Sequence, residues 1–276
     1  MIDDFKVFDS HLHYLGRFKP RNESILEYMD RFGIDKAAIT TLNRDASLNA
    51  IMTTGNKDAN NNHIIEQFVQ KEQYDHGPVR ALVDAHPERL VGFFWFNPKI
   101  AEESDWKLLR TYIEQYGFKG IKTQTFVDLL KIPEDLHLLA EFCIEYDLPL
   151  FIHSGTPFFF QKPVRLKAYY RLVKRYKELK VILGHSAFTM EHTISLLRYF
   201  RGFKNVFYET SCSIPYGIMT LIKAMGSGQV IYGSDAPAAT TPDIEINKIR
   251  ILNLPPEIAR QVFYDNFNKL IGLTEE

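Results

Sequence analysis

Short apolar runs alternate along this chain with longer stretches of helical periodicity, and this alternation limits the possible folds more than any other feature. Runs such as VILG at 181–184 and VIYG at 230–233 are almost wholly apolar, as expected of strands that are covered on both faces. Strands that alternate with helices predict a parallel sheet. The runs expected to form strands are 6–9, 36–41, 90–96, 120–123, 148–153, 181–184, 206–209 and 230–233.

Eight such units in a chain of 276 residues match the count and length of a (β/α)₈ TIM barrel, an α/β fold. We therefore predict a single domain over 1–276, with helices among the connections, for example at 134–146 and 190–200. The polar segment 43–74 is too long for a plain loop and one helix, so it predicts an insertion after the second strand. A doubly wound sheet is the main competing architecture.

Composition excludes several classes of function. The formal net charge is −1, so no basic field indicates binding to nucleic acid or to a membrane surface. The sequence contains no run of 18 apolar residues, so it predicts no membrane span. The first residues lack the pattern of a signal peptide. The two cysteines, Cys143 and Cys212, indicate reduced thiols, and we expect a cytoplasmic protein.

Polar residues gather at the predicted carboxyl ends of the strands, where a barrel carries its active site. They are four of the nine histidines, His11, His13, His153 and His185, together with Asp235. His11 and His13 point to the same side, because side chains alternate along a strand. Two imidazoles on one side can bind a divalent cation, and a third imidazole and a carboxylate would complete the protein ligands. Without a thiolate, this ligand set suits zinc, manganese or iron(II).

These pieces resemble the amidohydrolase superfamily: the His-x-His pair, the histidines on the fifth and sixth strands, and GSDAP at 233–237. The segments FKGIK, PLFIHSG, VILGHSA and YDNFNKLIGL resemble its "amidohydrolase 2" branch. That branch includes aminocarboxymuconate-semialdehyde decarboxylase, resorcylate-type decarboxylases and hydrolases of lactones and related acids. The resemblance extends over 7–273, essentially the whole chain.

The resemblance implies one divalent metal, with zinc as the first expectation, on His11, His13, His153 and Asp235. His185 would be a nearby acid/base or substrate-polarising group, and Asp235 would also take a proton from the attacking water. The resemblance further implies a homodimer and a small-molecule substrate.

Other polar residues near the strand ends are candidates for substrate binding. Lys122, at the end of the fourth strand, stands where some relatives have a carboxylated lysine that bridges two metals; we favour a point charge for a substrate carboxylate. Arg44 is a second candidate for that charge, and is equally well explained as a solvated loop cation. Asn97 and Glu209 could contact substrate, although Glu209 could equally pair with a neighbouring cation. Cys212 has no evident basic partner, so nucleophilic catalysis is not expected.

These residues are consistent with three functions. In the first, which we favour, a metal-activated water attacks a lactone, amide or ester of a small carboxylic acid. In the second, the same metal supports non-oxidative decarboxylation of an aromatic or unsaturated acid. The complete His-x-His pair favours hydrolysis, because some resorcylate-type decarboxylases begin with a carboxylate in place of His11. The third function is a catalytically inactive binding barrel, which would predict the loss of ligand positions.

Overall fold

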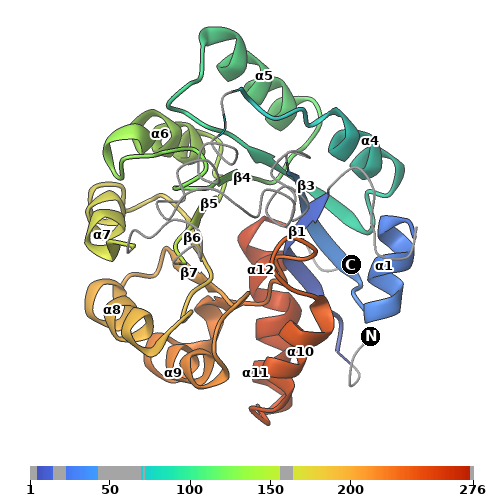
Figure 1. The fold of residues 1–276 in the computed structure, drawn as a ribbon, viewed down its shortest axis with the longest axis vertical. Coiled ribbons are helices and arrows are strands. Elements are labelled where there is room, and N and C mark those ends of the chain that lie inside the picture. The colour runs from blue at the N-terminus through green and yellow to red at the C-terminus, as the bar shows by residue number, and fades with distance from the viewer. Residues whose placement is uncertain (1–4, 15–22, 43–69, 71, 156–163, 274–276) are drawn as a thin grey trace, which may run out of the picture.

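The computed structural model describes residues 5–14, 23–42, 70, 72–155 and 164–273. Eight parallel strands form one sheet in the order β1 to β8, with helices around its outside (Figure 1). The strands are β1 Phe8–Tyr14, β2 Lys36–Thr41, β3 Leu90–Trp95, β4 Gly120–Thr123, β5 Leu150–His153, β6 Val181–Gly184, β7 Val206–Glu209 and β8 Val230–Ile231. The fold is a (β/α)₈ TIM barrel, as the sequence predicts.

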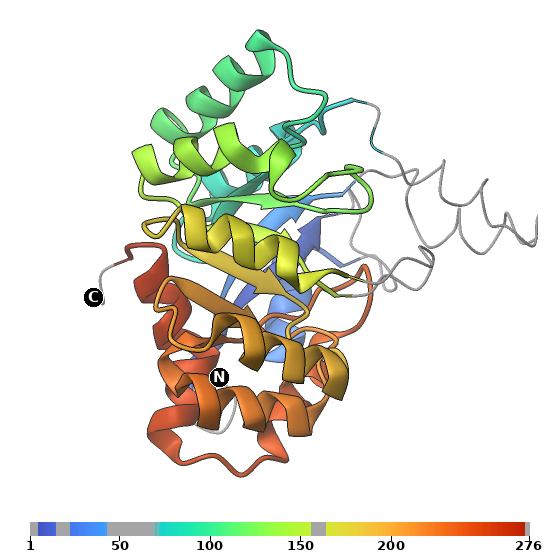
Figure 2. The ribbon, with the colours of Figure 1, turned by 90° about the vertical axis from the view of Figure 1, so that its left-hand side faces the viewer.

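Helices follow the strands and cover the barrel from outside, as the side view in Figure 2 shows for those between β5 and β8. The longer helices are α1 Ile25–Phe32, α4 Gly77–Ala85, α5 Glu103–Glu114, α6 His137–Glu145, α7 Leu166–Arg175, α8 Met190–Phe200, α9 Pro215–Met225 and α10 Pro242–Arg250. Among the described residues, no helix is both long and apolar enough to cross a membrane.

Predicted and observed strands differ most at β1. The sequence predicts a strand at 6–9, but β1 extends to Tyr14 and so contains the His-x-His pair. Along the ladder with β2, Asp9 pairs with Ala37 and Leu12 with Ile39, so β1 accommodates one extra residue in a bulge. The run DSHLH lacks the apolar character of a buried strand, which is why the predicted apolar run stopped at Asp9, although the same-side placement of His11 and His13 already required extended backbone there.

Two other predicted elements are, by contrast, shorter in the structure. The predicted strand 230–233 pairs only over Val230–Ile231. The predicted helix 134–146 begins with the 3₁₀ turn Glu134–Leu136, and α6 follows it. The helix at 190–200 coincides with α8. Of the predicted insertion at 43–74, residues 43–69 and 71 lie outside the described residues.

The barrel closes between β1 and the segment that follows β8, through separate backbone contacts rather than a continuous ladder. His13 N–H donates to the Ala236 carbonyl at 2.7 Å, and Asp235 N–H donates to the His11 carbonyl at 2.7 Å. The Asp9 carboxylate also accepts the Ser234 N–H at 3.0 Å. This closure places the His-x-His pair directly beside Asp235.

The interior of the barrel is apolar where the strands begin. Side chains such as Phe8, Phe93 and Ile182 form a cluster there with Phe267 and Ile271 from the C-terminal helical segment. That segment consists of α11 Pro256–Arg260, the π-helical turn Gln261–Asp265 and α12 Asn266–Leu270. Burial at this end leaves the opposite end, where the strands finish, for polar residues.

A substitution at Gly120 would show how tightly this interior is packed. A Cβ atom at Gly120 would lie 2.3 Å from Cε1 of Phe93, which is itself buried in the interior cluster. We expect Gly120→Ala to lower the free energy of unfolding by about 1–3 kcal/mol, measured by chemical denaturation. Gly228→Ala is the matched control, because a Cβ there meets no atom within 4 Å. Equal stability of the two variants would contradict tight packing around Phe93.

Candidate active site

Three candidate metal ligands converge at the closure between β1 and β8. Nε2 of His11 and Nε2 of His13 lie 3.1 Å apart. Oδ1 of Asp235 lies 3.3 Å from the first nitrogen and 2.9 Å from the second. Ligands that bind one cation at about 2.0–2.2 Å are separated by roughly such distances, so these three donors fit a divalent ion.

The protonation of His11 and Asp235 also suits a cation. Burial lowers the pKa of His11 well below its ordinary value, which favours the neutral imidazole. Burial alone would raise the pKa of Asp235, but His11, His13 and Lys122 together lower it by more than burial raises it, so the carboxylate stays ionised. Neutral imidazole and ionised carboxylate are the forms that bind metal.

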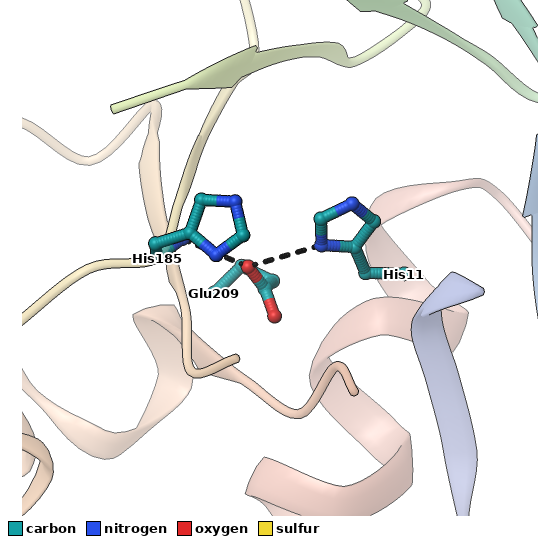
Figure 3. A group of neighbouring side chains, drawn as sticks. All are labelled: His11, His185 and Glu209. Atoms are coloured by element: carbon teal, nitrogen blue, oxygen red, sulfur yellow. Dashed lines mark hydrogen bonds and ion pairs between the residues drawn. The ribbon is translucent and has the colours of Figure 1, made fainter. Parts of the chain in front are cut away.

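A second layer of polar groups lies behind His11 and His185 and is centred on Glu209. Figure 3 shows the Glu209 carboxylate between His185 and His11, with His11 Nδ1 at 3.5 Å from Oε2. Oε2 accepts the backbone N–H of His185 at 2.9 Å and the hydroxyl of Ser211 at 2.8 Å. Oε1 accepts the backbone N–H of Ser211 at 2.6 Å. Burial raises the pKa of Glu209 to about 7, against the effect of these hydrogen bonds.

The hydroxyl of Ser211 connects this layer to the two histidines. It donates its single proton to Oε2 of Glu209. Its oxygen then accepts from Nδ1 of His185 at 2.9 Å and from Nδ1 of His11 at 3.3 Å. Both rings therefore carry hydrogen on Nδ1 and a lone pair on Nε2, the atom that faces Asp235.

Ser211 is thus a positioning residue that the sequence did not single out. Groups that orient a ligating histidine affect metal affinity by about 10–100-fold. We expect such a loss in Ser211→Ala, measured by competition with a chelator. Ser227→Ala is the control, since that hydroxyl donates a hydrogen bond to Gln261 and lies before the start of β8, at the opposite end of the strand from Asp235. A loss of equal size in both variants would indicate general destabilisation instead.

Lys122 lies inside the barrel with its side chain against the candidate ligands. Its Nζ is 2.8 Å from His11 Nε2 and 3.7 Å from the centroid of the Phe151 ring. The residue is 2% exposed, and burial lowers the pKa of its ammonium to about 8 while Asp235 and Glu209 oppose that shift. The ammonium group of Lys122, which the sequence predicts as a partner for a substrate carboxylate, therefore lies beside the candidate metal ligands.

His153 and His185 are neighbours, but they differ in their relation to Asp235. Nε2 of His185 lies 3.7 Å from Asp235 Oδ2. His153 packs its ring edge against His185, with centroids 4.5 Å apart, and its Nε2 lies 3.0 Å from the Gly155 carbonyl. The structure does not bring His153 into the group formed by His11, His13 and Asp235. Its role as a metal ligand stays a prediction.

The remaining predicted substrate residues lie in different settings. The amide of Asn97 is fully buried: it donates to the Asp128 carbonyl at 3.2 Å and accepts from Lys99 N–H at 3.1 Å. Its side chain thus fastens the loops after β3 and β4, and a contact with substrate stays a prediction. Glu209 is equally buried, in the layer behind the histidines. Arg44 lies outside the described residues.

Two further residues near the site were not predicted from the sequence. Trp95, the last residue of β3, has its ring centroid 5.8 Å from that of His13. Its indole N–H donates to the buried carboxylate of Asp128 at 3.2 Å, and burial raises the pKa of Asp128 to about 8. The apolar run LVGFFWF indicated only a strand. The thiol of Cys212 is also near, within 4.8 Å of candidate ligand atoms of His185 and Asp235.

Comparisons with known proteins agree with this architecture. The family model described as "Amidohydrolase" matches residues 8–273. No curated protein matches the chain in sequence. The fold resembles 5-carboxyvanillate decarboxylase from Sphingomonas paucimobilis, with 15% identity, a TM-score of 0.70, and coverage of 98% of this chain and 100% of that one.

Two other solved structures are similar over nearly their whole length. One is 2,6-dihydroxybenzoate decarboxylase from Rhizobium, with 14% identity, a TM-score of 0.63, and coverage of 97% of this chain and 98% of that one. The other is 5-carboxyvanillate decarboxylase from Novosphingobium aromaticivorans, complexed with manganese and 4-hydroxy-3-methoxy-5-nitrobenzoic acid. It shares 14% identity, with a TM-score of 0.64 and coverage of 98% of this chain and 97% of that one. At these identities the likeness shows a shared fold.

Proposed function

The chain belongs to the amidohydrolase family, and from this premise we propose that it is a metal-dependent, non-oxidative decarboxylase of a small aromatic or unsaturated carboxylic acid. The observation that carries the proposal is the enclosed ammonium of Lys122 beside the candidate metal ligands. The similar structures support it, since those named above are decarboxylases of aromatic acids and one of them holds manganese with an aromatic acid. This proposal replaces hydrolysis, which the sequence favoured, as the first choice.

Lys122 would hold the carboxylate of the substrate. An ammonium that is almost fully buried has lost most of its hydration, so a carboxylate beside it restores a favourable interaction. The face of Phe151 lies against the same ammonium, and the ring of Trp95 lies near His13. These rings offer apolar contacts for an unsaturated or aromatic acid.

The donor set fits one divalent cation on His11, His13 and Asp235, with His153 as a proposed fourth ligand. Such a cation would supply a Lewis acid that polarises substrate oxygens. Zinc was the first expectation, and two imidazoles with a carboxylate accommodate manganese equally well.

His185 would deliver the proton that decarboxylation requires. When the bond to the carboxyl group breaks, CO₂ leaves and the electron pair remains with the substrate carbon, where one proton must form the new C–H bond. Because Ser211 holds the hydrogen of His185 on Nδ1, the Nε2 lone pair is free to take a proton from substrate or solvent and pass it to that carbon.

Hydrolysis of a lactone, amide or ester is the second candidate. The presence of a histidine at position 11 favours it. A histidine stands there in place of the carboxylate with which some resorcylate-type decarboxylases begin. In this reaction Asp235 would take the proton of an attacking water, and His185 would polarise the carbonyl oxygen.

The two candidates are separated by their products. Protein loaded with manganese or zinc would be incubated in D₂O with hydroxybenzoates, unsaturated acids and lactones, and the products followed by NMR. Decarboxylation predicts release of CO₂ and one deuterium on the carbon that carried the carboxyl group. Opening of lactones without release of CO₂ would replace the first candidate by the second. Turnover of none of these substrates by metal-loaded protein would count against both.

A further inference from the structure

A second group of candidate ligands lies on the other side of Asp235. While Oδ1 of Asp235 faces His11 and His13, Oδ2 faces Nε2 of His185 at 3.7 Å. The thiol of Cys212 completes this group, and the candidate ligand atoms of the three residues all lie within 4.8 Å of one another. Asp235 is therefore shared between two sets of donors, one of nitrogen and oxygen and one that includes sulfur.

The backbone places these three residues in an unusual way. His185, Cys212 and Asp235 follow the neighbouring strands β6, β7 and β8. Each has a positive φ, of 58°, 57° and 54° respectively. Residues other than glycine rarely adopt this conformation, and it is concentrated at functional sites. Three such residues on adjacent strands bring their side chains to one point.

The thiol of Cys212 lies among carboxylates. Its sulfur is within 4.8 Å of a carboxylate oxygen of Asp235, and its backbone N–H donates to Oε2 of the buried Glu245 at 3.2 Å. Carboxylates at this distance attract a divalent cation, and a cation that binds a thiol deprotonates it.

We propose that His185, Cys212 and Asp235 form a second, inhibitory site for a soft divalent cation such as zinc or cadmium. Binding would replace the thiol proton by the metal and release that proton to solvent. Sulfur, imidazole and carboxylate donors together suit zinc and cadmium, whereas manganese prefers oxygen and nitrogen. The inhibitory effect rests on the proposed function, because a cation on Nε2 of His185 would prevent that atom from carrying a proton.

Cobalt(II) is the probe that tests the site without reference to activity, because a thiolate bound to cobalt gives a charge-transfer band in the near ultraviolet. We expect the band to grow as a second equivalent of cobalt binds to the wild-type protein. It should be absent from Cys212→Ser and retained in Cys143→Ala, which removes the chain's other cysteine. Absence of the band from wild-type protein at saturating cobalt, or its persistence in Cys212→Ser, would overturn the proposal.

Two further measurements complete the test. Excess zinc should inhibit the manganese-loaded wild-type enzyme, and the zinc concentration for half inhibition should rise at least about tenfold in Cys212→Ser, a change of about 1.4 kcal/mol. Each protein is compared with its own activity in manganese alone. In wild-type protein, the second equivalent of zinc should also slow alkylation of Cys212, mapped by mass spectrometry; unchanged alkylation would contradict the site even if the variant fails to fold.

The two proposals fail in different ways. A protein that shows the cobalt band but decarboxylates no acid would retain the second site and lose the proposed function. A protein that decarboxylates its substrate but shows neither band nor protection of Cys212 would retain the function and lose the second site.

Discussion

Asp235→Asn is expected to remove the bound metal and with it the activity. The carboxylate contributes one donor to the group with His11 and His13, and an amide of the same shape carries no charge to hold a divalent cation. We expect elemental analysis to show about one ion per chain in the wild-type protein and almost none in the variant. Loss of about 4 kcal/mol of transition-state stabilisation would lower kcat/KM by about 10³-fold.

An exposed aspartate on α10 provides the control for this variant. Asp243→Asn removes the same charge from an exposed position in the first turn of α10 and should leave metal content and turnover unchanged. Full metal content in Asp235→Asn would show that the cation binds elsewhere. About two ions per wild-type chain in metal-limited growth, with both retained in Cys212→Ser, would point to a binuclear centre that includes a carboxylated Lys122.

Lys122→Met should abolish turnover of carboxylate substrates while leaving the fold intact. Methionine has a similar length and no charge, so the variant loses the partner of the substrate carboxylate. We expect kcat/KM to fall by about 10³-fold, equivalent to about 4 kcal/mol. The free energy of unfolding should not fall, because burying the ammonium disfavours its charged form.

The metal content of the same variant separates two roles for Lys122. A substrate-binding lysine predicts unchanged or tighter metal binding, since a positive charge beside His11 is removed. If metal and activity are lost together, Lys122 is instead a ligand in carboxylated form. Lys107→Met, an exposed position on α5, is the control for the loss of one positive charge.

The sequence predicted the barrel well where strands are buried on both sides. The bounds of β2, β4, β6 and β7 coincide with the predicted runs, because each is a short run whose residues are almost all buried. It failed at β1, where the histidines and Asp9 interrupt the apolar pattern, and where the bulge depends on pairing with β2. Polar residues of an active site thus obscure the strand that carries them.

The sequence indicated the three residues that lie together in the inner group, but it did not indicate Ser211 in the layer behind them. His11, His13 and Asp235 were indicated by their place at the strand ends, and the structure brings them together. Ser211 lies 200 residues from His11 in sequence, so no local pattern reveals the contact between them. The position of His153 follows from its hydrogen bond to the Gly155 carbonyl, which residue types alone do not predict.

Because the barrel closes between β1 and the segment after β8, a cation bound at this junction would link the two ends of the sheet. Asp9 and Ser234 are 225 residues apart in sequence, and the strands that they join are the first and last of the sheet. An ion held by His11, His13 and Asp235 would cross-link these two ends and close nearly the whole chain into one loop. Cross-links that close long loops remove much entropy from the unfolded chain. A chelator should therefore accelerate amide exchange at the junction of β1 and β8 before it does so elsewhere, as the barrel opens along this line.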